Sequence, residues 1–344
     1  MLGAIIGDIA GAARMGGGAP TPEAGLLGPA GEFTDESVLT MAVADALLHG
    51  HHPRKALFLW GTRHPKCAYD PAFSNWLDTW ELSPYGGCGC GAAARVSPAA
   101  LLGASLDEAL WFAVKVSQVT HDHPGALKGA KATAHAIFLA RFGADATEIR
   151  RTLERAYGYD MDRPLAAMGT RPCPQEVADE AVPNAIVCAL DAGSFEEAIG
   201  RVVSLAGDKD AYGAIAGPVA EALYGIPDGL ARRVVASLPE DMRETLQKLY
   251  AHTEYANPVP GLRPAIPAGQ LRRRYEALLP IVELPGKRTF RIRLGQGWES
   301  FLFHGPATAA WLRERLAQGG EDPQEPAAAD CRDLVALVLE AWPA

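Results

Sequence analysis

Hydrophobic residues recur every three or four positions along most of residues 1–255. Residues with this spacing lie on one face of an α-helix, so the pattern predicts helices that each bury an apolar face. Hardly any alternation of polar and apolar residues, the pattern of a strand, occurs before about residue 255. The fold class expected for this region is all-α. The predicted helices span 37–48, 106–119, 125–142, 147–157, 176–190, 195–205, 211–224, 229–237 and 240–252.

The pattern changes after residue 255. Four prolines within 256–269 predict a stiff linker or an extended segment. Farther along, polar and apolar residues alternate over 288–305 around Gly295-Gln296-Gly297, which predicts a β-hairpin. We therefore divide the chain into a compact helical domain (1–255), a Pro-rich linker (256–269) and a small α+β C-terminal extension (270–344) of unassigned role. Further helices are predicted over 270–279, over 307–316 and at the end of the chain.

Length and charge narrow the class of protein. With 344 residues, 48% of them hydrophobic, the chain can form a substantial core. Its net charge of −9 argues against a nucleic-acid surface, and the basic run at 272–274 is expected to be a solvated helix face. No apolar stretch reaches the ~20 residues needed to span a membrane. We expect no membrane contact and a monomer.

The cysteines and the first residues indicate the compartment. The six cysteines form no CxxC pair and have no histidines at zinc spacing, which favours reduced thiols. The apolar start of the chain has no basic residues and is interrupted by Asp8, unlike a signal peptide. A cytoplasmic protein is expected.

Two of the predicted helices begin with acidic residues. Thr34, Asp35 and Glu36 precede the first predicted helix, and Asp208 and Asp210 precede the one that ends at residue 224. Such residues cap the free amides of a first turn and interact favourably with the helix dipole. Carboxylates from two separate segments also suit a hard cation such as Mg²⁺, and both interpretations stay open at this point.

Two other segments carry candidate chemistry. The glycine-rich YGGCGCGAAARVSP (85–98) can expose backbone amides to an anion such as a pyrophosphate. A tight helix–helix contact lined by glycine and alanine explains the same residues equally well. His121 and His123 stand just before a helix that starts with proline, where such a pair more often satisfies loop carbonyls than binds zinc.

Taken in order, these segments resemble the ADP-ribosylglycohydrolase family. GAIIGDIAGAA at the start is similar to the family's opening helix with its Gly-Asp-x-x-Gly, and FTDES matches the position of its Thr-Asp-Asp-Thr motif. GCGCGAAARVSP corresponds to Gly-Asn-Gly-Ala-Ala-Met-Arg-x-x-Pro, and THDHPGALKGAKA to Thr-His-x-His-Pro. AGDKDA stands where the family ordinarily has Gly-Gly-Asp-x-Asp-Thr. The resemblance covers residues 1 to about 250 and leaves the tail uncovered.

The resemblance implies an all-α domain with two Mg²⁺ ions in a cleft, or Mn²⁺ in their place. By position, the implied metal ligands are Thr34, Asp35, Glu36, Asp208 and Asp210. Asp35 and Glu36 are also the implied catalytic residues. In such a site the metals orient the ribose hydroxyls and a water, which carboxylates activate beside an oxocarbenium-like centre.

The resemblance also implies the substrate-binding residues and the reaction. Gly89, Cys90, Gly91 and Ala92 fall where the family binds the phosphates of ADP-ribose, and His121 falls near its ribose. The implied reaction is metal-dependent hydrolysis of the glycosidic bond that links ADP-ribose to an arginine or serine side chain or a related acceptor. The implied partner is an ADP-ribosylated protein or ADP-ribose itself.

Several positions depart from the family pattern where the chemistry takes place. Ala211 replaces a threonine ligand, Glu36 replaces the second aspartate, and Lys209 adds a cation between two ligands. Cys90 replaces an asparagine, and Met15 stands where many members carry a gating glutamate. One cation, or none, is therefore also compatible with this sequence. The alternative function is that of a catalytically impaired relative, which binds ADP-ribose or a protein partner without hydrolysis.

Overall fold

The computed structural model describes residues 1–15, 25–28, 32–79, 83–164, 168 and 177–253, and the backbone of three strands between 282 and 302. The Pro-rich linker and the helices predicted over 270–279, over 307–316 and at the end of the chain lie outside the described residues. The division of the chain at residue 255 therefore stays a prediction.

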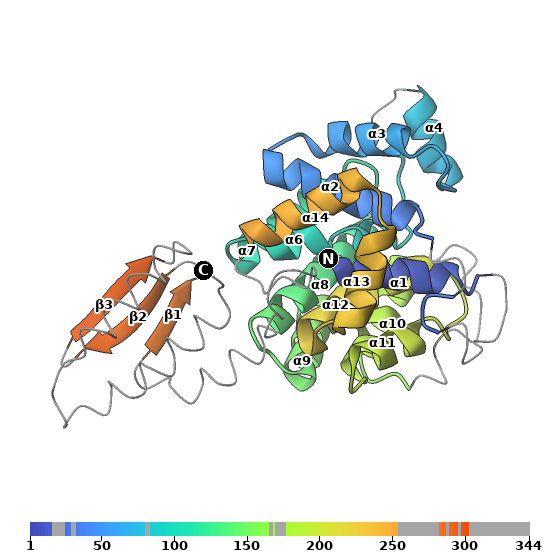
Figure 1. Ribbon diagram of the computed structural model, residues 1–344. Coiled ribbons are helices and arrows are strands. Elements are labelled where there is room, and N and C mark those ends of the chain that lie inside the picture. Colours follow the sequence, from blue (N-terminus) through green and yellow to red (C-terminus); the bar gives the residue numbers. More distant parts are fainter. Residues whose placement is uncertain are drawn as a thin grey trace.

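The described part of residues 1–253 contains helices and no strand, which confirms the all-α fold class (Figure 1). Each helix predicted from hydrophobic spacing is present, with ends shifted by a few residues. No described helix has the length and apolar character that crossing a membrane requires. The helices are α1 Leu2–Ala12, α2 Asp35–His49, α3 Pro53–Arg63, α4 Pro71–Thr79, α5 Gly91–Ala94, α6 Ser97–Leu102, α7 Leu106–Ser117, α8 Pro124–Arg141, α9 Ala146–Tyr157, α10 Ala178–Leu190, α11 Phe195–Val202, α12 Lys209–Tyr224, α13 Asp228–Ser237 and α14 Glu240–His252.

Some of these helices have no clear signal in the spacing of hydrophobic residues. Helix α1 is buried along almost its whole length, so its sequence shows no polar stripe that would reveal an amphipathic helix. Helices α5 and α6 are only four and six residues long, which is too short for the periodicity to be read.

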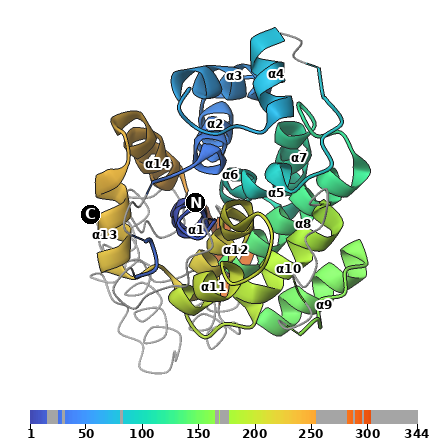
Figure 2. The ribbon, with the colours of Figure 1, turned by 90° about the vertical axis from the view of Figure 1, so that its right-hand side faces the viewer.

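Helices α1 and α12 pack backbone to backbone in the interior of the fold (Figure 2). Glycines face each other in antiparallel order, Gly3 against Gly217 and Gly7 against Gly213. A Cβ atom on Gly7 would lie 1.9 Å from the carbonyl oxygen of Gly213. Any residue with a Cβ would clash at this distance, so only glycine fits here. The last glycine of α1, Gly11, meets the carbonyl of Lys209 in the same way. This contact brings the C-terminal half of α1 to the N-terminus of α12.

The buried amino group of Met1 ties three helices together. It lies 2.7 Å from Glu221 Oε2 on α12 and donates to the hydroxyl of Tyr250 on α14. That hydroxyl donates in turn to the other carboxylate oxygen of Glu221. A buried carboxylate needs such charged and neutral donors, because it has lost its hydration.

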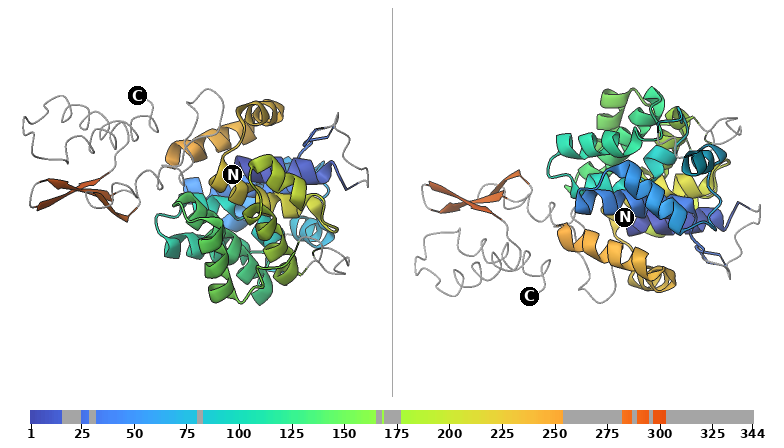
Figure 3. Two further views of the ribbon diagram at one scale, coloured as in Figure 1. Left: turned by 90° about the horizontal axis from the view of Figure 1, so that it is seen from below. Right: turned by 90° about the horizontal axis from the view of Figure 1, so that it is seen from above.

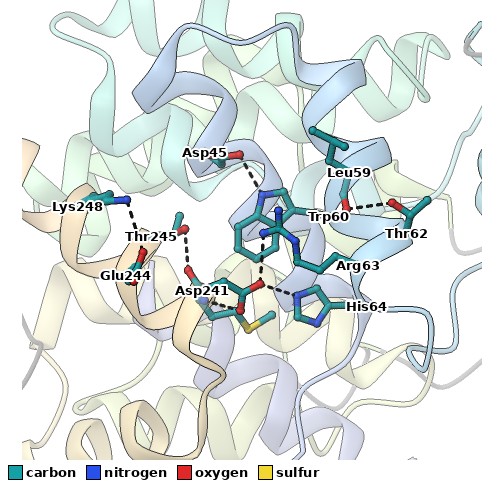
Figure 4. A network of polar contacts seen from close by, with 11 residues as sticks. Asp45, Leu59, Trp60, Thr62, Arg63, His64, Asp241, Glu244, Thr245 and Lys248 are labelled. Atoms are coloured by element: carbon teal, nitrogen blue, oxygen red, sulfur yellow. Dashed lines mark hydrogen bonds and ion pairs between the residues drawn. The ribbon is translucent and has the colours of Figure 1, made fainter.

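A second polar network joins α3 to α14 (Figure 4). Arg63 and His64, at the end of α3, lie 3.4 and 3.3 Å from the carboxylate of Asp241 in the first turn of α14. The ring of His64 stacks on Trp60 and contacts Phe33 edge-on. Since Phe33 immediately precedes Thr34, this network supports the segment that leads into α2.

The predicted β-hairpin is present in the tail as part of a three-stranded antiparallel sheet (Figure 3). Strand β2 (Thr289–Leu294) pairs with β3 (Gly297–Leu302), and Leu294 faces Gly297 across the two-residue connection. Strand β1 (Val282–Gly286) pairs with β2 on its other edge. The alternation in the sequence predicted β2 and β3, whereas β1 was missed because its segment includes proline and glycine.

Candidate active site

Asp8 anchors the start of α2 on α1. Its buried carboxylate accepts hydrogen bonds from the backbone N–H and the hydroxyl of both Thr34 and Ser37. The Thr34 hydroxyl donates a hydrogen bond to Asp8 at 2.6 Å, so the lone pairs of Thr34 Oγ1 remain available as acceptors. One of them accepts from the N–H of Glu36 at 3.3 Å, which makes Thr34 the N-cap of α2. Asp8 was not predicted as a site residue, although a single charged residue in an otherwise apolar helix was a signal.

Three carboxyl groups, those of Asp8, Asp35 and Glu36, have raised pKa values, and the negative charge of Asp210 contributes to each shift. Burial raises the pKa of Asp8 to about 6, and the negative charge of Asp210 adds to the effect. Burial, followed by the charges of Asp8 and Asp210, raises the pKa of Asp35 to about 7. The pKa of Glu36 lies well above its ordinary value because of burial and then because of Asp35 and Asp210. Buried, mutually repelling carboxylates are characteristic of functional sites.

Among these carboxyl groups, that of Glu36 has a buried oxygen that lacks a hydrogen-bond donor. Its Oε2 atom is buried and has no hydrogen-bond partner. A buried carboxylate oxygen without a donor is costly, and a cation or a ligand donor would relieve that cost. Carboxylate oxygens are ligands that suit a hard divalent cation. Within the part of the chain that the structure describes, no three His, Cys, Asp or Glu side chains are already arranged as a ligand set, so side chains would have to turn to bind one.

The start of α12 contributes the second acidic segment. Asp208 is the N-cap of α12 and makes no capping hydrogen bond through its side chain. Asp210, in the first turn, accepts from the N–H of Ala211 at 3.0 Å. Helix capping therefore explains Thr34 at the start of α2, whereas it does not explain Asp208 at the start of α12. Lys209 is half-buried between the two aspartates, and Ala211 is fully buried.

The glycine-rich segment borders Glu36 and His121. Of its four implied substrate-binding residues, Cys90 and Ala92 are buried, and Gly89 and Gly91 are partly exposed. A Cβ atom on Gly91 would lie 3.8 Å from Glu36 Oε1 and 3.7 Å from His121 Nε2, both ordinary contact distances. The structure thus brings the glycine-rich segment, one acidic helix start and His121 to one point.

The two histidines of the predicted pair have different environments. His123 is the N-cap of α8, where its Nδ1 accepts from the N–H of Gly125 at 3.1 Å. His121 is buried, and its Nδ1 lies 2.9 Å from the hydroxyl oxygen of Thr120. Burial, followed by the positive charge of Arg95, lowers the pKa of His121 to about 3, so its ring is neutral at physiological pH.

The loop after α3 lies near Asp35 and Asp8, although no residue of this loop was predicted to belong to the site. The negative charge of Asp70 contributes to the raised pKa of Asp35. Burial, and then the charges of Asp35 and Asp8, raise the pKa of the Cys67 thiol to about 11. Met15, at the position of the implied gating glutamate, follows α1 and is 54% exposed. No local motif in the sequence connects this loop with the acidic helix starts.

Comparison with known proteins agrees with the fold and the order of the segments. A family model described as ADP-ribosylglycohydrolase matches residues 1–262. Among solved structures, 44 chains match. One of them, an "ADP-ribosylglycohydrolase-related protein complex", has a TM-score of 0.56 and 24% sequence identity, over 73% of this chain and 96% of that chain. At this identity the likeness concerns the fold. No curated protein matches the chain.

Proposed function

Because this chain belongs to the ADP-ribosylglycohydrolase family, a family of hydrolases, we propose that it hydrolyses the glycosidic bond between ADP-ribose and a protein side chain, either arginine or serine, or a related acceptor. The observation that carries the proposal is the position of Gly91 between the orphaned carboxylate of Glu36 and the Nε2 atom of His121. The family match favours this function over the alternative of binding without hydrolysis.

The substrate is proposed to bind along the glycine-rich segment. Gly89, Cys90, Gly91 and Ala92 would receive the phosphates of ADP-ribose, because the absence of side chains at the glycines lets an anion approach the backbone. His121 would donate a hydrogen bond from Nε2 to the ribose. This placement puts the reacting carbon of the ribose on the side of Asp35 and Glu36.

The acidic residues would hold one or two divalent cations, Mg²⁺ or Mn²⁺. The proposed ligands are Thr34, Asp35, Glu36, Asp208 and Asp210. A bound cation would supply Lewis acidity and orient the ribose hydroxyls and a water molecule. The hydroxyl of Thr34 is prepared for such a role, because it donates its hydrogen bond to Asp8 and keeps one lone pair that neither Asp8 nor the N–H of Glu36 uses.

Asp35 and Glu36 are the proposed bases. A carboxylate with a pKa of about 7, as for Asp35, can accept a proton from water near neutral pH and give it up again. The water oxygen forms a bond to the anomeric carbon while the bond from that carbon to the acceptor breaks. The proton passes from the water to the carboxylate and then to the departing acceptor, so that free ADP-ribose and the unmodified side chain result.

The compartment and partner follow from the same proposal. Cys67, Cys88 and Cys188 are free cysteines, which supports a reducing compartment such as the cytoplasm. The partner would be an ADP-ribosylated protein, or ADP-ribose as the product, met by the enzyme as a monomer.

The proposed activity is tested by parallel hydrolysis assays on arginine-, serine- and nucleic-acid-linked ADP-ribose, with Mg²⁺ or Mn²⁺ added. We expect release of ADP-ribose from at least one substrate and a loss of about 10²–10⁴-fold in Glu36→Gln. Glu196→Gln is the matched control, since Glu196 is an exposed glutamate in the first turn of α11. Hydrolysis of none of the three substrates with either metal would show that the proposed function is wrong.

A further inference from the structure

Arg95 is a buried cation that points away from the solvent. The residue is 1% exposed, and its guanidinium donates to the carbonyl of Val116, the carbonyl of Ser117 and the hydroxyl oxygen of Thr120. A buried charge is costly, so a residue of this kind is held in place by its acceptors. Its position fixes Thr120 Oγ1 as an acceptor, since arginine has only donors.

The proton of the Thr120 hydroxyl must therefore go to another group. Its hydrogen-bonding neighbours are His121 Nδ1 at 2.9 Å, the carbonyl oxygen of Ser117 at 3.4 Å and the hydroxyl of Tyr85. The Ser117 carbonyl already accepts from the backbone N–H of His121 at 2.9 Å and from that of Thr120 at 3.2 Å. The shorter distance and the occupied carbonyl favour donation to His121 Nδ1 over the Ser117 carbonyl. The Tyr85 hydroxyl has a proton of its own and can donate it to the second lone pair of Thr120 Oγ1, which leaves the Thr120 proton for His121 Nδ1.

A hydrogen bond accepted at Nδ1 fixes the tautomer of a neutral imidazole. With Nδ1 as the acceptor, the ring proton resides on Nε2. The ring cannot turn freely, because Gly87 packs against it so closely that a Cβ there would lie 2.7 Å from His121 Cδ2. Tyr85 contacts the ring edge-on, with ring centroids 5.6 Å apart. Among the described residues, Nε2 has no hydrogen-bond partner of its own, and it lies 3.7 Å from the position that a Cβ on Gly91 would take.

We propose that Arg95 and Thr120 are positioning residues, which hold His121 with its proton on Nε2 so that this N–H is presented to a ligand bound at Gly91. The proposal rests on the proposed function only in the identity of that ligand, ADP-ribose. Neither Arg95 nor Thr120 needs to touch the ligand, since both act through the ring of His121.

The test reads the tautomer directly, in the full chain and without substrate. Histidine labelled with ¹⁵N is incorporated, long-range proton–nitrogen NMR spectra are recorded at neutral pH, and the His121 signals are identified by their absence in His121→Gln. Wild type and Thr120→Ser, which keeps the hydroxyl, should show the Nε2–H tautomer. Thr120→Val, which has the same shape without the hydroxyl, should show a mixture of tautomers or Nδ1–H.

Calorimetry with ADP-ribose supplies the second readout. We expect Thr120→Val to bind about three- to tenfold more weakly than wild type, the value of one hydrogen bond, and Thr120→Ser to bind as wild type does. A wild-type His121 with its proton on Nδ1, or an unchanged Nε2–H tautomer in Thr120→Val, would overturn the proposal. If Thr120→Val fails to fold by circular dichroism, the spectra of wild type and Thr120→Ser still decide. Absence of ADP-ribose binding to wild type would instead contradict the proposed function and leave the tautomer test valid.

Discussion

The substitution Gly7→Ala tests the contact on which the site depends. A methyl group on Gly7 would lie 1.9 Å from the Gly213 carbonyl oxygen, about 1.5 Å short of the 3.4 Å at which ordinary contact begins. The obstacle is helix backbone, which cannot rotate away as a side chain can. Helices α1 and α12 must therefore separate, or one of them must bend.

The expected effect is a loss of stability of about 2 kcal/mol. Overpacking costs about 1–3 kcal/mol, and a rigid backbone obstacle places Gly7→Ala at the upper end. The higher helix propensity of alanine offsets about 1 kcal/mol of this cost. For a domain of this size, a net loss of about 2 kcal/mol lowers the Tm by roughly 4–8 °C.

The assay compares thermal and urea unfolding of the full-length wild type, Gly7→Ala and Gly200→Ala. Gly200 is the matched control, because it is an exposed residue of α11 where an added Cβ atom would meet no other atom within 4 Å. The same change there should raise stability by about 0.5–1 kcal/mol. If Gly7→Ala is as stable as Gly200→Ala, the two helices do not meet through their backbones and the reasoning is refuted.

Three further predictions concern the candidate site. Gly91→Leu should abolish ADP-ribose binding with little change in Tm, because a side chain longer than a Cβ enters the space in front of Glu36. Gly91→Ala should still bind, because a Cβ atom fits there. Calorimetry measures both affinities, and unchanged binding by the leucine variant would contradict the prediction. The metal-free protein should lose stability as pH rises from about 4 to 7, through the raised pKa values of Asp8 and Asp35, and added Mg²⁺ should stabilise it at pH 8 far more than at pH 5. Equal stabilisation by Mg²⁺ at both pH values in a thermal-shift series would argue against these carboxylates as the binding groups. Lys209→Thr combined with Ala211→Thr should tighten Mg²⁺ binding, since a hydroxyl is added and a positive charge is removed. Equal affinities of wild type and the double variant in calorimetry would show that neither residue limits the affinity for Mg²⁺.

The sign of the pH prediction follows from the direction of the pKa shifts. In the unfolded chain an aspartate titrates near 3.9, whereas Asp8 titrates at about 6 and Asp35 at about 7 when folded. Between these values the folded state binds more protons than the unfolded state, so its stability is greatest at the acidic end and falls as pH rises. A cation reverses the effect above pH 7, because it binds the deprotonated carboxylates.

Much of the candidate site was visible in the sequence as separate segments. The acidic start at Asp35, the acidic pair around Lys209 and the glycine-rich segment each stood out locally, and the resemblance to a family placed them in one active site. Asp8 escaped this reasoning, although it holds Thr34 and thereby the start of α2. Its role depends on a contact between residues 26 positions apart, which a local pattern does not contain.

The sequence by itself predicted nine of the fourteen described helices and the β-hairpin, because the period of hydrophobic residues indicates which face of each element is buried. The hydrophobic period does not indicate which other element covers that face. Only the tertiary structure decided that α1 and α12 pack through facing glycines and so bring Asp8 near Asp210. The same holds for His121, whose neutral ring depends on burial and on the nearby charge of Arg95, 26 positions earlier in the chain. Burial and electrostatic interaction depend on distance in space, and the chain acquires those distances only when it folds.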